Sequence, residues 1–472
     1  MTGAMPPPPP DRERPDAVAD RGDPIDVGRV LDEGHWGRYQ RFLLLLIAVA
    51  IVFDGADIQV LGIALPAMMR EWAVPRSVFA PILAAGIFGM MLGGAGAGMT
   101  GDRLGRRVAL ISSVLVFGLL TIATSMVTGP IALAALRFLA GLGLGGALPN
   151  AAALASEFVP RRHRSIAVTL TIVCVPIGGT LAGFLAIRML PAFGWRWLFA
   201  IAGLAPAAVA LLLMRLLPES PRYLARHPAR WDELARSLRR MGHVISTGAA
   251  FVDRSETERV HAAVGALFTR DFRTDTLALW AAFSSCLLAV YLGFNWVPAL
   301  LSAAGMSPAV GSAGITAFNL GGVGGAIAGA LAFSRFGSKV TMLAMAGGAA
   351  IGAIGLALVP IGHASAVLPL FVMLGVTGGL INAVQTTMYA LAAQVYPTTV
   401  RATGVGAAVA VGRCGAIAST YAGAWALERG SSSFFALVAA AMLVALIALA
   451  LIRRHIPGTS GRDLSYDRGR HG

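Results

Sequence analysis

The chain has 472 residues, of which 56% are hydrophobic and only 13% are charged. Soluble domains are close to a quarter charged, whereas apolar runs of about 20 residues, each long enough to cross a bilayer as a helix, recur along this whole chain. The composition excludes a soluble domain and predicts an all-α polytopic membrane protein.

The N-terminal residues differ from the rest of the chain. The stretch MTGAMPPPPPDRERPDAVADRGDP (1–24) has no apolar core, so it does not have the form of a signal peptide. Its proline run favours an extended chain. We predict that residues 1–38 form a disordered tail.

The length of the apolar runs predicts about twelve spanning helices. They cover residues 42–68, 78–99, 107–128, 130–157, 165–187 and 195–217, and then 276–301, 307–333, 339–361, 365–395, 402–427 and 432–453. The chain then divides into an N-terminal half (39–217), a linker (218–274), a C-terminal half (275–455) and a tail (456–472). The linker is rich in arginine, and its stretch WDELARSLRRMG has the pattern of a short amphipathic helix.

The net charge of +14 would suit nucleic-acid binding, but its distribution argues against that partner. Basic residues gather in alternate loops, such as 103–107, 161–164 and 215–273, and the loops between them carry few. This alternation is the positive-inside pattern of proteins that span a lipid bilayer. It predicts that both termini and the linker are cytoplasmic.

Two acids, Asp54 and Asp57, interrupt the first predicted span in the stretch IVFDGADIQVLGIALP (51–66). Asp54 lies roughly 18 Å along the helix from the start of the span, near the middle of the bilayer. A charged aspartate there costs about 2.5–3.5 kcal/mol. The spacing puts both acids on one helix face. We interpret them as a proton-coupling site that faces a cavity, and the alternative is a structural pair with an arginine.

Two stretches recur in both halves. They are GDRLGRR (101–107) with FSRFGSK (333–339), and ALASEFVPRRHRSIA (153–167) with ALAAQVYPTTVRATG (390–404). The second match aligns Arg164 with Arg401, and both matches fall after the second and fourth spans of their halves. Duplicated six-helix halves, with a site between them near the midplane, are the architecture of a rocking transporter.

The fourth span begins near Arg137 and ends at Glu157, positions that suit either a gate ion pair or a structural role. Its run GLGLGG (141–146) is similar to a phosphate-binding loop, but no strand precedes it. Close helix packing is the expected role of these glycines. The sequence contains no Walker motif and no cluster of metal-ligating residues, so we predict no ATP site, cofactor, metal or enzymatic activity.

Polar residues also interrupt three later spans. They are Tyr291, Asn295 and Trp296 in the seventh, Asn382, Gln385, Thr386 and Tyr389 in one stripe of the tenth, and Arg413 in the middle of the eleventh. The seventh- and tenth-span groups suit a cavity for a ring-bearing solute with polar substituents, or hydrogen bonds between helices. A buried arginine requires a carboxylate, either an internal aspartate or that of a substrate.

These motifs resemble the major facilitator superfamily over residues 38–455. GDRLGRR is similar to its signature between spans two and three, and RFLAGLGLGGALPN (137–150) is similar to its span-four motif. The resemblance implies that the first motif latches the two halves and that Ser334 weakens the second copy. The residues assigned to gating are Gly101, Asp102, Arg103, Gly105, Arg106, Arg107, Arg164 and Arg401.

The stretch FDGADIQVLGIALP (53–66) resembles the aromatic acid:proton symporter family, as do residues 318–330 and 396–417. The resemblance implies a monomeric secondary transporter of a bacterial inner membrane. It would couple uptake of a benzoate- or hydroxybenzoate-like acid to protons by alternating access. Proton coupling is assigned to Asp54, Asp57, Arg137 and Glu157, and substrate binding to Asp57, Arg413 and the polar residues of spans seven and ten.

Two other functions remain open at this point. PESPRYL (218–224) also resembles a segment of sugar porters, although their glutamine-rich seventh-span signature is missing here. A porter for another organic anion is a second form of this alternative. A transporter-like membrane sensor is the alternative of another class, but it would normally add a longer signalling domain than the linker offers.

Overall fold

The structure is a computed structural model that describes residues 24–246, 248–254, 264–361, 367–397 and 400–458. Within these ranges, twelve helices are long and apolar enough to cross a membrane. They are α2 (Arg38–Trp72), α3 (Phe79–Leu104), α4 (Arg106–Thr124), α5 (Pro130–Phe158), α6 (Arg164–Phe193), α7 (Trp195–Leu216), α10 (Arg273–Ala303), α11 (Pro308–Phe336), α12 (Ser338–Leu358), α13 (Val367–Val395), α14 (Arg401–Glu428) and α15 (Ser431–Leu451). The predicted all-α fold with twelve spans is confirmed. Several helices continue past the predicted spans, because hydropathy marks the hydrocarbon layer and a helix can extend beyond it.

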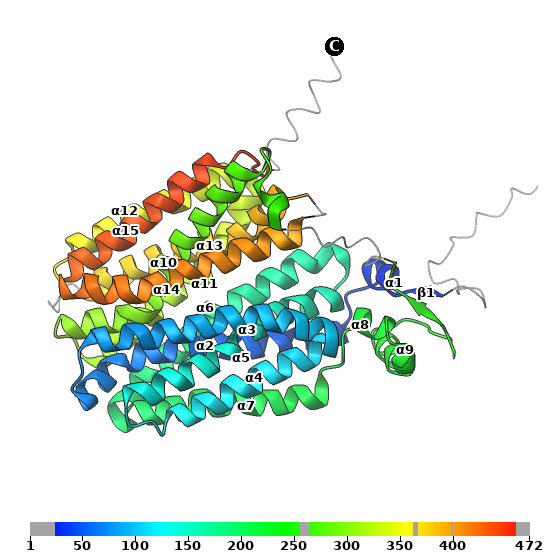
Figure 1. Cartoon of the computed structure of the whole chain (residues 1–472), viewed down its shortest axis with the longest axis horizontal. Helices are drawn as coiled ribbons and strands as arrows, with labels where there is room; N and C mark the ends of the chain where they lie inside the picture. The colour runs from blue at the N-terminus through cyan, green and yellow to red at the C-terminus, as the bar shows by residue number, and fades with distance from the viewer. Residues whose placement is uncertain (1–23, 247, 255–263, 362–366, 398–399, 459–472) are drawn as a thin grey trace, which may run out of the picture.

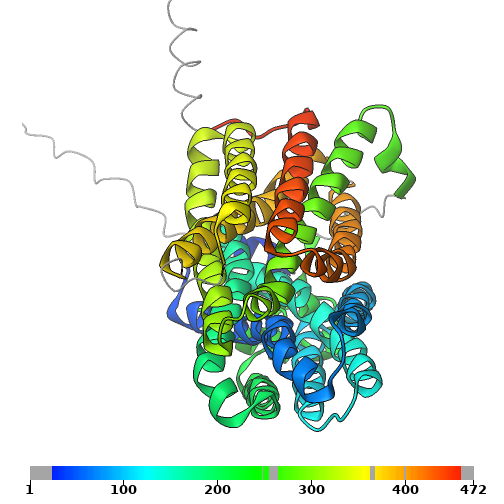
Figure 2. The same cartoon turned by 90° about the vertical axis from the view of Figure 1, so that its left-hand side faces the viewer.

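The described spanning helices, α2 to α7 and α10 to α15, form two bundles, one from each half of the chain (Figures 1 and 2). The packing repeats between them: α2 packs on α6 and α3 on α5 in the first bundle, as α10 packs on α14 and α11 on α13 in the second. The bundles meet where α6 contacts α11, α3 contacts α14 and α2 contacts α10. The two pseudo-repeat halves predicted from the recurring stretches are therefore confirmed.

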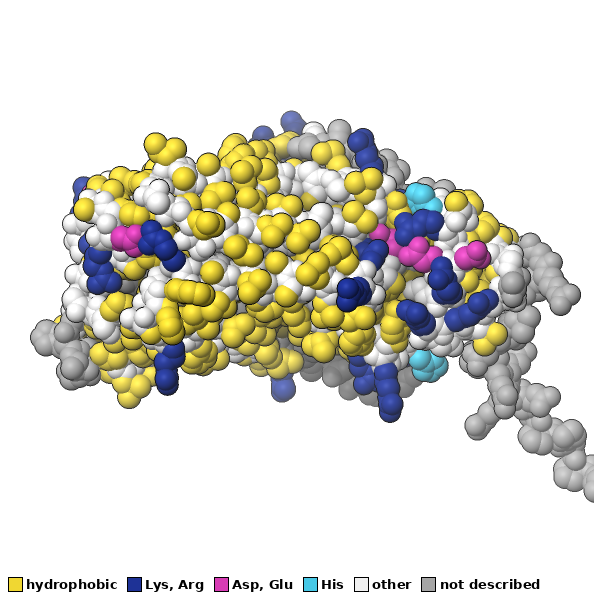
Figure 3. Space-filling model, turned by 90° about the horizontal axis from the view of Figure 1, so that it is seen from below, with side chains coloured by type: hydrophobic (Ala, Val, Ile, Leu, Met, Phe, Trp, Pro, Cys, Tyr) yellow, Lys and Arg dark blue, Asp and Glu magenta, His cyan; other side chains and the backbone are white. Residues whose placement is uncertain are grey.

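The outer surface is mainly hydrophobic between its two ends. On the face shown in Figure 3, most Lys and Arg side chains lie toward the ends and hydrophobic side chains cover much of the middle. Large apolar side chains such as Leu204, Leu211 and Ile351 are more than half exposed, at 62%, 57% and 71%. Such a belt is what a helical bundle presents to lipid.

The linker and the N-terminal segment form a small layer at one end of the N-terminal bundle, which we call the linker end (Figure 1). The layer contains β1 (Ile25–Asp26), α1 (Val27–Glu33), α8 (Pro221–Ala225), α9 (Trp231–Arg240) and β2 (Phe251–Val252). Short 3-10 turns among the described residues are η1 (Arg76–Val78), η2 (Arg161–His163), η3 (Pro228–Arg230) and η5 (Val264–Phe268). The strands pair in parallel, with Ile25 opposite Phe251. Helix α9 confirms the amphipathic helix predicted from WDELARSLRRMG.

The predicted disordered tail is wrong for its last part, residues 24–38, which contain β1, α1 and the start of α2. Helix α1 packs inward through its apolar side chains, and Asp32 at its end forms an ion pair with Arg164. The partners that order this segment are distant in sequence, so composition did not reveal them. Residues 1–23 and 459–472 of the two predicted tails lie outside the described residues.

Glycines allow α3 and α5 to pack closely. A Cβ atom at Gly145 would lie 2.1 Å from the carbonyl oxygen of Met90 and 2.6 Å from the backbone nitrogen of Gly94. Neither neighbour is a side chain that can move aside. The GLGLGG run therefore serves helix packing, as small residues do in membrane proteins.

We expect Gly145→Ala to destabilise the N-terminal bundle, because overpacking of a close contact costs about 1–3 kcal/mol. Thermal denaturation of the purified protein in detergent measures the effect. Gly98→Ala on α3 is the matched control, because an added Cβ meets no atom within 4 Å there and alanine favours a helix over glycine. Equal melting temperatures of Gly145→Ala and the parent would contradict this account of the packing.

Candidate functional site

Asp57 on α2 forms a buried ion pair with Arg137 on α5, in which Arg137 Nη1 lies 3.3 Å from Asp57 Oδ2. Thr121 Oγ1 donates a hydrogen bond to Asp57 Oδ1. Arg137 Nη2 donates to the hydroxyls of Thr121 at 3.1 Å and Thr124 at 2.8 Å. The Asp57 carboxylate is thus compensated within the N-terminal half. Arg137 contacts Asp57 and not Glu157, which lies near the linker end of α5.

Asp54 lies one turn before Asp57 on the same buried face of α2, but its surroundings differ. It lines a cavity of about 70 Å³ between the halves, and Arg413 on α14 lines the same cavity from the other half. In the described part of the chain, Asp54 Oδ1 and Arg413 Nη1 are buried without a hydrogen-bond partner. A carboxyl group and a guanidinium group therefore face one cavity, each with a buried atom that has no hydrogen-bond partner.

The predicted polar residues of spans seven and ten gather around this central cavity. Tyr291 on α10 lines it, together with Asn382, Gln385, Thr386 and Tyr389 on α13. Asn382 Nδ2 donates to the Gly378 carbonyl at 2.9 Å, and Thr386 Oγ1 donates to the Asn382 carbonyl at 2.8 Å. Both hydrogen bonds stay within α13. For Asn382 and Thr386, the structure therefore does not show the hydrogen bonds between helices that were the alternative prediction.

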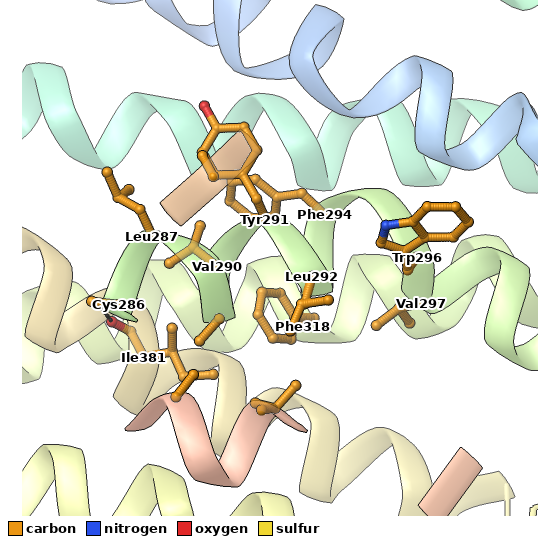
Figure 4. Close-up of a cluster of buried hydrophobic side chains, with 14 of the residues drawn as sticks. Cys286, Leu287, Val290, Tyr291, Leu292, Phe294, Trp296, Val297, Phe318 and Ile381 are labelled. Carbon is orange, nitrogen blue, oxygen red and sulfur yellow. Dashed lines mark hydrogen bonds between the residues drawn. The ribbon is translucent and has the colours of Figure 1, made fainter. Parts of the chain in front are cut away.

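The structure separates the three predicted residues of span seven. Tyr291 also lines a second cavity of about 40 Å³, with Asn295, Asp57 and Arg137. Trp296 is fully buried and belongs to the lining of neither cavity. Figure 4 shows the Tyr291 and Trp296 rings apart from each other along α10. The spacing of residues along the sequence shows which of them share one face of a helix. The rotation of that helix in the bundle determines which face lines a cavity.

Aromatic and aliphatic side chains that the sequence did not single out complete the central cavity. They include Ile58, Phe294 and Val409. The Tyr389 ring is held edge-on against Phe283, with ring centroids 5.5 Å apart. No sequence signal separates these apolar residues from ordinary lipid-facing or core positions, because all of them lie in apolar runs.

A pair of amides that joins the two halves was also missed. Gln59 Nε2 donates to Asn319 Oδ1 at 3.0 Å, and Asn319 Nδ2 donates to Gln59 Oε1 at 2.6 Å. Arg76 Nη1 joins the halves again by donating to the Leu427 carbonyl at 3.1 Å. Both contacts lie beyond Asp54 on the side away from the linker end, and the bundles incline apart toward the linker end (Figure 1). Gln59, a polar residue inside an apolar span and two residues after Asp57, was the feature of the sequence that could have indicated this contact.

The predicted gating motif, residues 101–107, makes its contacts within the N-terminal half and the linker. Asp102 forms an ion pair with Arg106 one turn later, and the Arg103 carbonyl accepts a hydrogen bond from the Tyr223 hydroxyl at 3.1 Å. A Cβ atom at Gly101 would lie 2.3 Å from Asn150 Oδ1 on α5. These contacts are not the latch between halves that the resemblance implied.

The end of the motif is fixed by a buried acid of the linker. Gly105 has φ +104°, a conformation that favours glycine, and an added Cβ would lie 2.2 Å from Glu219 Oε2. Glu219 Oε1 accepts hydrogen bonds from the backbone N–H groups of Arg107 and Ser220, both at 2.9 Å. Burial raises the pKa of the Glu219 carboxyl, and these two hydrogen bonds oppose the shift.

The remaining predicted charges lie near the linker end. Glu157 accepts a hydrogen bond from the Ser220 hydroxyl, and Arg164 forms an ion pair with Asp32. Arg401, the repeat counterpart of Arg164, is exposed at the start of α14. The structure thus does not bring Glu157, Arg164 and Arg401 to the central cavity.

The central cavity offers groups that bind a solute or exchange a proton: a guanidinium, a carboxyl group, two phenol rings, amides and a hydroxyl. Across the described ranges, no group of three or more His, Cys, Asp or Glu side chains is placed to hold a metal ion. The two central charges come from different halves, so a ligand bound between them contacts both.

Comparison with known proteins agrees with this architecture. The sequence model of the Major Facilitator Superfamily matches residues 47–420. A gallate transporter of Pseudomonas putida is 35% identical over 409 residues, which cover 86% of this chain and 90% of that protein. The 4-hydroxybenzoate transporter PcaK of Pseudomonas putida is 32% identical over 413 residues, covering 87% and 91% of the two chains.

Solved structures show the same fold at lower identity. The xylose transporter XylE from E. coli, in a partially occluded inward open conformation, superposes with a TM-score of 0.69 at 16% identity, covering 87% of this chain and 97% of that chain. The family model and the relatives each match most of the chain. The chain therefore belongs to the Major Facilitator Superfamily, in the family that includes these gallate and 4-hydroxybenzoate transporters, and it is a transporter and not an enzyme.

Proposed function

We propose that this chain imports an aromatic carboxylic acid together with protons by alternating access. The observation that carries the proposal is the pair of buried, unsatisfied atoms, Asp54 Oδ1 and Arg413 Nη1, that face one cavity from opposite halves. The relatives named for gallate and 4-hydroxybenzoate support the substrate class. The cavity lies within one chain, so a monomer is the expected functional unit.

Arg413 is the proposed binding group for the substrate carboxylate. A guanidinium presents two parallel N–H donors that match the two oxygens of a carboxylate, and Nη1 of Arg413 is buried without a partner. A sugar has no charge to offer to this group. The unpaired arginine therefore favours an anion over a sugar, although a porter for another organic anion would satisfy it too.

The walls of the cavity suit an aromatic ring. The rings of Tyr291, Phe294 and Tyr389 line it, and aromatic rings stack on one another in offset or edge-on arrangements. Gln385 and Thr386 of α13 lie in the same lining, where an amide and a hydroxyl can contact ring substituents such as hydroxyl groups. These groups fit a solute that has a carboxylate at one end and a substituted aromatic ring at the other.

Asp54 is the proposed coupling group. A substrate carboxylate beside an ionised Asp54 would place two anions in a low-dielectric cavity, where repulsion between like charges is strong. A proton on Asp54 removes that repulsion and leaves Arg413 to the substrate. Proton and substrate then bind together, and neither is favoured alone. This is the condition for symport.

Asp57, Arg137 and Glu157 are proposed to support coupling in a second way. A proton on Asp57 would release Arg137 from its ion pair, which leaves a buried cation that needs another partner. Tyr291 lines both the cavity that contains Asp57 and the central cavity that contains Asp54. A movement of Tyr291 that follows protonation of Asp57 would therefore change the shape of the central cavity. Glu157, at the linker end of α5, is the further acid.

We propose that the chain lies in a bacterial inner membrane with the linker end on the cytoplasmic side, because basic residues gather in the loops at that end. The contacts that join the halves lie on the other side, so we propose that this conformation releases substrate to the cytoplasm. Movement to the opposite state would bring the linker ends of the halves together. Residues 101–107, Arg164 and Arg401 lie there, and we propose that they form the gate in that state.

The proposal is tested by uptake into liposomes that contain the purified protein. An outside-acidic proton gradient should drive accumulation of labelled 4-hydroxybenzoate, gallate or benzoate above that of protein-free liposomes, and an uncoupler should abolish it. Xylose is the competing substrate. Xylose uptake without acid uptake would select a sugar porter, and accumulation that needs ATP in place of the gradient would overturn proton coupling.

We expect Asp54→Asn to separate binding from coupling, because asparagine resembles the protonated acid and cannot release the proton. The variant should still exchange labelled for unlabelled acid across the liposome membrane, but it should lose accumulation under a proton gradient. Asp275→Asn is the control, since Asp275 is equally buried but lies outside the central cavity, and it should accumulate substrate. Normal accumulation by Asp54→Asn would assign Asp54 a structural role.

We expect Arg413→Lys to weaken aromatic-acid binding by tenfold or more, because an ammonium does not reproduce the two-pronged contact and charge-assisted hydrogen bonds contribute about 1.5–3 kcal/mol. Arg413→Ala should be weaker still. Calorimetry on monodisperse protein measures the affinity. Arg429→Lys, an exposed site just after α14, is the matched control. Parent-like affinity of Arg413→Lys would show that another group binds the carboxylate.

A further inference from the structure

A further cavity, distinct from the two described above, lies at the linker end of the N-terminal bundle. Its volume is about 200 Å³, against about 70 Å³ for the central cavity. It lies where α2 and α4 begin, where α7 ends and where α9 packs beside them. Four arginines line it, Arg107, Arg215, Arg236 and Arg240, with Glu233 as the acid among them. We call it the arginine cavity.

Helix α9 turns one complete face toward the arginine cavity. Glu233, Arg236, Ser237 and Arg240 all line it, and their spacing of three, four and seven residues places them on one side of a helix. Leu234 and Leu238, on another side of α9, are fully buried in the protein core. Packing of the apolar side therefore fixes the direction in which the polar side points.

Three polar groups of the arginine cavity have buried atoms without a partner. Within the described chain, Ser237 Oγ, Tyr39 Oη and Arg107 Nε are buried and form no hydrogen bond. Ser237 is only 4% exposed. Buried polar atoms nearly always have a partner in native proteins. Two hydroxyls and a guanidinium that meet in one cavity are a set of donors that lacks its acceptor.

The charge of the arginine cavity favours an anion as that acceptor. The single acid, Glu233, already accepts hydrogen bonds from Arg230 at 2.8 and 3.1 Å. Arg107 Nη2 donates to the Met214 carbonyl, and Arg236 Nε donates to the Asp232 carbonyl at 3.2 Å. These partners are uncharged carbonyl groups. Glu219 interacts electrostatically with Arg107, but the arginines of the cavity still outnumber its single acid, Glu233.

The position of the arginine cavity points to the membrane as the source of the anion. Arg215 and Leu216 close α7 and line the cavity. Leu212 and Met214, just before them, are exposed at 45% and 40%. An acyl chain along these side chains would place its headgroup at the level of the arginines. Figure 3 shows Lys and Arg side chains gathered at this end, next to the hydrophobic surface of the bundle.

We propose that the arginine cavity binds the phosphate of an anionic membrane phospholipid. The phosphate oxygens accept hydrogen bonds from the Tyr39 and Ser237 hydroxyls and from the guanidinium groups, and the acyl chains lie along α7. The lipid then holds α9 against the ends of α2, α4 and α7. All of its contacts belong to the N-terminal half and the linker, so this site does not overlap the central cavity.

The test uses the delipidated full-length protein in detergent, titrated with phosphatidylglycerol or with phosphatidylcholine of the same acyl chains, and counts bound lipid by native mass spectrometry. We expect phosphatidylglycerol to bind at least tenfold more tightly. The double variant R236Q/R240Q should lose tenfold or more of that affinity. R161Q/R162Q is the matched control, because it removes the same charge from exposed residues of η2 at the same end, and it should bind like the parent.

A second double variant separates lipid binding from folding. Tyr39→Phe with Ser237→Ala removes two hydroxyls that have no partner in the protein, so the lipid-free melting temperature should not fall, whereas phosphatidylglycerol affinity should fall several-fold. Parent-like affinity of this variant would overturn the proposal, as would equal losses in R161Q/R162Q or equal binding of phosphatidylcholine. Inorganic phosphate is the remaining arm: if it displaces the lipid at equal concentration, the site takes a soluble anion and the lipid assignment is wrong.

Discussion

The free-energy cost of an uncompensated charge in a low-dielectric interior is the constraint that organises this molecule. Two aspartates one turn apart on α2 meet it differently. Asp57 receives an ion pair from Arg137 and a hydrogen bond from Thr121, all within its own half. Asp54 faces Arg413 across a cavity, and each keeps a buried atom without a partner. On one face of α2, Asp57 is thus held in a fixed ion pair, whereas Asp54 beside it can change its charge when a ligand binds.

The internal repeat does not include the two charged residues of the central cavity, Asp54 and Arg413. The offset between residues 153–167 and 390–404 relates Pro176 to Arg413, and the offset between residues 101–107 and 333–339, which lie nearer to α2, relates Asp54 to Cys286. Asp54, Pro176 and Arg413 line the central cavity, whereas Cys286 is fully buried in the core. Neither of the two charged residues therefore has a charged counterpart in the other half. The acid stands in one half and the base in the other, so each half folds without the charge that its counterpart carries. An anionic substrate and a proton give the asymmetry a reason.

Local patterns were enough to predict the spans and much of the cavity lining. Hydropathy marks where a helix crosses the bilayer, and a period of 3.6 residues marks the polar stripe on α13. Partners could not be predicted in the same way, because they depend on how each helix is rotated against its neighbours. The Asp57–Arg137 ion pair and the placement of Trp296 away from the cavity both follow from that rotation. The order of residues 24–38 depends on Arg164, which a polar, proline-rich composition does not reveal.

The placement of ion pairs is what allows two such halves to move. The ion pairs that the structure describes lie within the N-terminal half and its linker, as Asp57 with Arg137 does, or within the C-terminal half, as Asp275 with Arg454 does. Across the boundary, Gln59 and Asn319 form an uncharged pair. Exchange of such a hydrogen bond for water costs about 0.5–1.5 kcal/mol, whereas breaking a buried ion pair costs about 3–5 kcal/mol. The halves can therefore part without breaking the stronger contacts. Asp54 and Arg413 face each other across the boundary between the halves. A proton that binds Asp54 and a carboxylate that binds Arg413 therefore act directly on the contact between the halves, which changes when the halves move.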